Sequence, residues 1–92
     1  MSNIDWSKMI TAQMKAEQAA AALLTQVQAE TARLRSIADV AIAPLQDAVD
    51  LDEATDSEAA LLKEWKRYRV ALNRLPEQQG YPAEISWPAP PA

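Results

Sequence analysis

The feature that most constrains the fold is a run of about 33 residues, from position 10 to position 42, that contains neither glycine nor proline. Alanine, glutamine, glutamate, leucine, lysine and arginine dominate this run, and these residue types favour helices. An α-helix of that length would be roughly 50 Å long at about 1.5 Å of rise per residue. The remainder of a 92-residue chain is too short to cover it. Part of this helix must therefore face water or another protein.

Apolar side chains recur along this helix at alternating steps of four and three residues, a spacing typical of a coiled-coil seam. Two interpretations are open: the stripe packs on a hairpin partner within the chain, or it forms a homo-oligomer with further copies. Because alanine is frequent in the seam, self-association would bury little area and be modest. The positions are Ala20, Leu24, Val27, Thr31, Leu34, Ala38, Ala41, Leu45 and Ala48, and we predict oligomerisation through Leu24, Val27, Leu34, Ala38 and Leu45.

Pro44 interrupts the helical run. Proline lacks the N–H that an interior helical turn donates, and it disfavours helical geometry at the residue before it. We therefore predict a break or sharp kink at Ala43, followed by a short helix over residues 44–51. Residues 47–56 are acidic, and we interpret this segment as a solvated loop; residues 47–58 together carry six acids and no base.

A third helix is predicted to begin at Thr55, because Thr55 and Glu58 have the spacing of a capping box. Pro76 ends it, and the prolines beyond predict an extended tail. The sequence thus predicts an all-α fold in three parts. These are the lead and long helix (1–43), a helical region (44–76) and an extended, proline-rich tail (77–92).

Aromatic and aliphatic side chains mark the third helix and the tail as candidate docking surfaces. One face of the helix carries apolar residues at steps of four and three, and the tail carries a tryptophan near its end. Core packing is the competing interpretation for Trp65 and Tyr68, whereas little core is available as far along the chain as Trp87. The predicted partner-binding residues are Trp65, Tyr68, Leu72, Tyr81, Ile85 and Trp87.

The composition argues against covalent chemistry. Histidine and cysteine are absent, which removes the usual metal ligands, the thiol nucleophile and the histidine base. The single glycine excludes a glycine-rich phosphate loop. A pair of acids can act as catalyst when a walled pocket separates their two pKa values. This chain is too short to build such a pocket around its acidic pairs. We predict no enzyme, no cofactor, no metal and no small-molecule substrate.

Nucleic-acid and membrane binding are also disfavoured. The formal net charge is −4, which opposes general attraction to nucleic acid or to an anionic membrane. Four cations near position 70 lie beside Trp65 and Tyr68, but these aromatics fall on the apolar stripe, where core packing competes with stacking on bases. The start has no secretory signal pattern, and no run approaches the roughly 20 apolar residues that span a bilayer. A cytoplasmic location is therefore expected.

Several sequence words carry a resemblance to a known family. They are PLQDAVDL (44–51), WKRYRVALNR (65–74), LPEQQGYP (75–82) and ISWP (85–88), with DWSKMITA (5–12) before the long helix. In this order they resemble the C-terminal region of tailed-phage tail fibre assembly proteins, and the ending is also similar to small phage tail assembly chaperones. Longer members carry an additional N-terminal domain tied to fibre contact, for which this sequence shows no counterpart.

The resemblance implies an assembly chaperone or adaptor that binds a tail fibre protein in the host cytoplasm and has no catalytic residues. Retention of some members on the finished fibre is also implied. The alternative function is a permanent structural component of the tail or fibre, held by the long coiled-coil helix. Both interpretations make protein–protein binding the activity of the chain.

Overall fold

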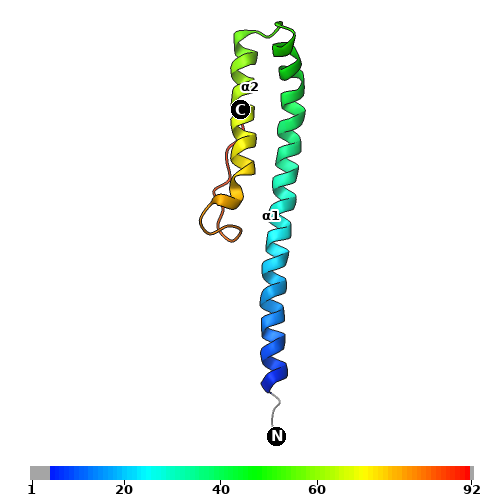
Figure 1. The fold of residues 1–92 in the computed structure, drawn as a ribbon, viewed down its shortest axis with the longest axis vertical. Helices are drawn as coiled ribbons and strands as arrows, with labels where there is room; N and C mark the ends of the chain where they lie inside the picture. The colour runs from blue at the N-terminus through cyan, green and yellow to red at the C-terminus, as the bar shows by residue number, and fades with distance from the viewer. Residues whose placement is uncertain (1–4, 92) are drawn as a thin grey trace.

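The chain forms a helical hairpin with one long and one short arm (Figure 1). The computed structural model describes the backbone of residues 5–91 and the side chains of residues 13–91. Helix α1 spans Asp5–Asp50, helix α2 spans Asp56–Asn73, and a 3-10 turn, η1, spans Leu75–Glu77. The described residues contain no strand, and the molecule measures 79 × 20 × 17 Å. The all-α prediction is confirmed.

The predicted break at Ala43 is wrong, because α1, which is 46 residues long, continues through Pro44 to Asp50. The described chain therefore has two α-helices rather than three, and the expected boundary between residues 43 and 44 lies inside α1. Pro44 is exposed, and it removes one helical hydrogen bond. Ile42 and Leu45 on either side of it are buried in the hairpin core, so packing holds both neighbouring turns in helical geometry.

A tight turn joins the two helices. The N–H of Glu53 donates to the carbonyl of Ala48 at 2.8 Å, and the N–H of Asp52 donates to the carbonyl of Val49 at 3.1 Å. This pair of bonds is the Schellman arrangement, which requires a left-handed residue after the helix. Asp52 takes that conformation with φ of 57°, which aspartate tolerates better than most side chains. The turn reverses the chain so that α2 runs antiparallel to α1.

The capping box predicted at the start of α2 is confirmed. The N–H of Glu58 donates to the hydroxyl of Thr55 at 3.1 Å, and the N–H of Thr55 donates to the Glu58 carboxylate at 3.0 Å. Each bond satisfies a backbone donor that the first turn of a helix leaves without a partner.

We expect Thr55→Ala to lower the free energy of unfolding by about 1 kcal/mol, because it removes the side-chain acceptor of this cap. Thermal unfolding followed by circular dichroism measures the change. The neighbouring Ser57→Ala variant is the control, because Ser57 is exposed and belongs to neither of the two cap hydrogen bonds. An equal effect of the two substitutions would contradict the capping role.

The core lies between α2 and the C-terminal half of α1. Its buried members come from three elements, and its partly buried neighbours extend into the tail. Trp65 and Tyr68 stack edge to face there, with ring centroids 5.8 Å apart and an interplanar angle of 82°. The buried members are Ala38, Ile42 and Leu45 from α1, Leu62, Tyr68 and Leu72 from α2, and Leu75 from η1.

The tail folds back on the hairpin. After η1 it forms turns to residue 84, and residues 85–91 return along α2 without regular structure (Figure 1). The side-chain amide of Gln78 closes this loop: it donates to the carbonyl of Ser86 at 2.9 Å and accepts from the N–H of Ser86 at 2.8 Å. The prediction of an extended tail over 77–92 is therefore not supported, because residues 77–84 form compact turns.

Candidate protein-binding surface

Three of the predicted partner-binding residues belong to the hairpin core. Leu72 is 0% exposed, Tyr68 is buried, and Trp65 is partly buried against the same cluster. These side chains come from the face of α2 that packs on α1. In this conformation the three side chains pack inside the hairpin and expose little area to a binding partner.

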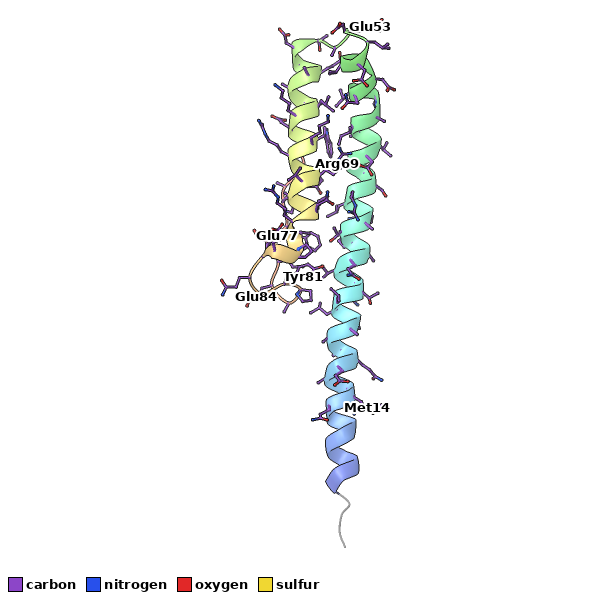
Figure 2. The ribbon with its side chains drawn as sticks, viewed as in Figure 1. Met14, Glu53, Arg69, Glu77, Tyr81 and Glu84 are labelled. Carbon is purple, nitrogen blue, oxygen red and sulfur yellow. The ribbon has the colours of Figure 1, made fainter. Side chains whose placement is uncertain are left out.

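The other three predicted residues lie in the tail. Tyr81 and Ile85 are partly buried against the core, and Tyr81 lies in the loop that faces α1 (Figure 2). Trp87 is 40% exposed, a large value for an indole that could bury more area. The structure thus brings Tyr81 and Ile85 onto the core and leaves Trp87 as the accessible aromatic of the predicted set.

The predicted oligomerisation residues differ in burial according to their position along α1. Val27, Ala38 and Leu45 are buried within the single chain, and Leu34 packs against the core cluster. For Leu34, Ala38 and Leu45, packing within the hairpin therefore occupies the apolar stripe. Leu24 is partly buried and lies next to the segment 13–23, every residue of which is exposed.

That exposed segment is a single helix without a described neighbour. Helix α2 and the tail lie beside the C-terminal part of α1 only, so the N-terminal part stands free (Figure 1). Met14, labelled in Figure 2, is 52% exposed there. Apolar side chains on this segment are available to another protein.

A groove lies on the outer side of α2, where the tail begins. It has a volume of about 570 Å³ and is lined by Lys66, Arg67, Val70, Ala71, Arg74 and Gln78. Val70 is 45% exposed and, with Ala71, supplies its apolar part. A second hollow of about 360 Å³ shares Arg67 and Ala71 and is bounded by the prolines of the returning tail. Both hollows are open to the surface.

Ion pairs among the described residues lie outside this groove. Arg69 bridges α2 to Asp39 of α1 at 3.0 Å, and Arg33 pairs with Glu30 on α1 at 2.7 Å. The Arg33 guanidinium donates to Glu30 and thereby lowers the pKa of that carboxyl. Within residues 13–91, neither Lys66, Arg67 nor Arg74 forms an ion pair, so the groove is a net positive site.

The described residues contain no group of acidic side chains that could hold a metal ion. No helix in that part of the chain is long and apolar enough to cross a membrane. The arrangement offers apolar contact, hydrogen bonding and positive charge, which are the means of protein recognition. The sequence pattern indicated the cations but not Val70, which α2 places beside them, or Gln78, which lies after η1 and joins the groove through the fold of the tail.

Residues 2–92 match the family described as "Caudovirales tail fibre assembly protein, lambda gpK". This chain belongs to the tail fibre assembly protein family. The match covers the hairpin and the tail together, which confirms the resemblance carried by the sequence words. No solved structure matches the chain.

Several curated members of the tail fibre assembly family are similar to this chain. Protein TfaD of Escherichia coli K12 is 50% identical over 58 residues, which are 63% of this chain and 30% of TfaD. The tail fiber assembly protein of Escherichia phage lambda shows the same identity over 29% of its length. A probable tail fiber assembly protein of Acyrthosiphon pisum secondary endosymbiont phage 1 is 44% identical over 69 residues, or 43% of its length. The matched part therefore spans less than half of each of these relatives.

Proposed function

We propose that this protein assists the assembly of a phage tail fibre by binding the fibre protein without covalent chemistry. The observation that carries the proposal is the family match over residues 2–92. The lambda relative is named a tail fiber assembly protein, and its similarity to this chain supports the same role here. The fold agrees with the proposal, because a slender hairpin presents much surface for its size.

The proposed contact surface is the returning tail with the core beneath it. Trp87 contributes an exposed indole, and Tyr81 and Ile85 hold the tail against the hairpin. Trp65, Tyr68 and Leu72 form the packed support under this surface. Aromatic side chains on a rigid base are typical anchors of protein interfaces.

We also propose that the chain self-associates through the free part of α1. Residues 13–23 are exposed, and the apolar stripe continues from Leu24 to Ala20 inside this segment. This exposed helix is also the observation that favours the second candidate function, a permanent structural component of the tail. Under the first function the protein acts in the host cytoplasm during assembly, and under the second it stays in the virion.

Co-expression with the fibre protein of the same phage tests the two functions. If the chain is an assembly factor, the yield of soluble, assembled fibre depends on it, and purified virions contain little of it. If the chain is a structural component, virions contain it in fixed proportion and fibre yield does not depend on it. Both functions would be contradicted if the fibre assembles fully without the chain and purified virions also lack it.

We expect Trp87→Ala to weaken binding to the fibre protein by about tenfold, the effect of losing a modest interface anchor. The helix content should stay unchanged, because Trp87 lies outside both helices and is not part of the core cluster. Isothermal titration and far-UV circular dichroism measure the two quantities. Val40→Ala is the matched control, because Val40 is an exposed apolar residue on α1. Loss of helicity in the Trp87 variant would mean that the tail serves internal packing instead.

A further inference from the structure

Helix α2 presents positive charge on the side that faces away from α1. Lys66, Arg67 and Arg74 line the groove described above, and none of them forms an ion pair with a residue in 13–91. The one cation of this helix that is paired, Arg69, reaches Asp39 on α1. The groove cations are therefore available to a second molecule.

No acid lines this groove, and Glu64 and Glu77, three residues from Arg67 and Arg74, form no ion pair within residues 13–91. Six further acids lie between residues 47 and 58, around the hairpin turn where Glu53 lies in Figure 2, whereas the groove lies toward the other end of α2. Asp56 and Lys66 are ten residues apart in the helix, which is about 15 Å along its axis. The positive groove thus stands against a chain whose net charge is −4. A local charge opposite to the net charge favours a partner of specific sign at this place.

The groove also has an apolar floor and a fixed wall. Val70 and Ala71 lie between the cations, and Gln78 forms the wall where the tail begins. Two hydrogen bonds between the Gln78 side chain, which donates one and accepts the other, and the backbone of Ser86 hold this wall in place before any partner arrives. A preformed site of this kind loses less conformational entropy on binding.

We propose that this groove binds an acidic segment of the fibre protein with a small apolar side chain between its acids. The inference rests on the proposed function and adds the chemistry of the partner. Arg67 and Val70, three residues apart, share one face of α2, and Arg74 follows the last residue of the helix, with its N–H donating to the carbonyl of Val70 at 3.1 Å. The two arginines are about 10 Å apart along the axis. The bound segment therefore places two carboxylates at about that separation, with its apolar residue on Val70.

A nucleic acid fits this groove less well. Its floor is apolar, its lining contains no aromatic side chain on which a base could stack, and the chain as a whole repels phosphates. An acidic peptide uses both the cations and the floor. Nucleic-acid binding is accordingly an outcome that the experiment must be able to detect.

The test compares two charge-reversal variants of the full chain. Lys66→Glu with Arg67→Glu changes the groove, and Lys63→Glu with Arg33→Glu is the control variant, with the same change in net charge. Lys63 and Arg33 are exposed, lie outside segment 13–23 and do not line the groove, and the ion pair of Arg33 with Glu30 is local to α1. The measurements are affinity for the purified fibre protein at about 50 mM and about 500 mM salt, which brackets strong and weak screening. Far-UV circular dichroism checks that both variants fold, and a DNA duplex is titrated in parallel.

We expect the groove variant to bind the fibre protein about tenfold more weakly at low salt, with a smaller difference at high salt, and the control variant to bind like the unmodified chain. Equal affinities for the two variants would overturn the groove assignment while leaving fibre binding, and so the proposed function, intact. DNA binding that only the groove substitutions remove, with unchanged fibre binding, would overturn it in favour of nucleic acid. If the unmodified chain does not bind the fibre protein, the proposed function fails and the groove assignment fails with it.

Discussion

Replacing Leu72 by Ala is expected to lower the free energy of unfolding by about 2–5 kcal/mol, the range for deleting a buried leucine side chain. Leu72 is 0% exposed and lies in the cluster that joins α1, α2 and η1. The remaining hairpin has too few buried side chains to close the cavity. A small domain has about 5–15 kcal/mol of stability in total, so the loss would remove a large share of it. Urea unfolding followed by circular dichroism measures the difference.

Val70→Ala is the matched control for this prediction. Val70 lies two residues away on α2 and is 45% exposed, so its truncation should change the free energy of unfolding by less than about 0.5 kcal/mol. If Leu72→Ala cost no more than Val70→Ala, the packing of α2 on α1 would not be what stabilises the fold.

The second large effect has the opposite sign. Pro44→Ala is expected to raise the free energy of unfolding by about 2 kcal/mol. Proline inside a helix costs about 3 kcal/mol relative to alanine, and Pro44 lies within α1. About 1 kcal/mol of that gain is offset, because alanine gives the unfolded chain more freedom than proline does. The shift in the midpoint of thermal unfolding reports the net change.

Pro76→Ala serves as the comparison, since Pro76 lies in the first turn of η1, where proline is tolerated. That variant should be neutral or slightly less stable than the unmodified chain. A Pro44→Ala variant that is also neutral would mean that α1 bends at this position and that the proline is already accommodated.

The features that depend on neighbouring residues alone were predictable from the sequence. The start of α2 was readable because Thr55 and Glu58 form the cap through neighbouring backbone groups. The long helix was readable because nothing in its sequence stops it before position 43. The rule for proline failed at Pro44, since burial of Ile42 and Leu45 against α2 outweighs the lost hydrogen bond. Only the structure shows that packing.

The candidate site was predicted less completely, because it depends on which face of each helix finds a partner in the chain. The spacing of Trp65, Tyr68 and Leu72 marks an apolar face, but spacing alone does not distinguish a core from an interface. The structure places this face in the core. The groove on the opposite side needs Gln78 near Arg74 and the tail closed by Ser86, an arrangement that no sequence periodicity encodes.

The short turn between the helices has a kinetic consequence. Only residues 51–55 separate α1 from α2, so the core joins segments that are close along the chain. Proteins dominated by such nearby contacts fold within microseconds to milliseconds. The hairpin would thus reach its native form almost as soon as it leaves the ribosome, well ahead of a large fibre whose distant segments must find one another.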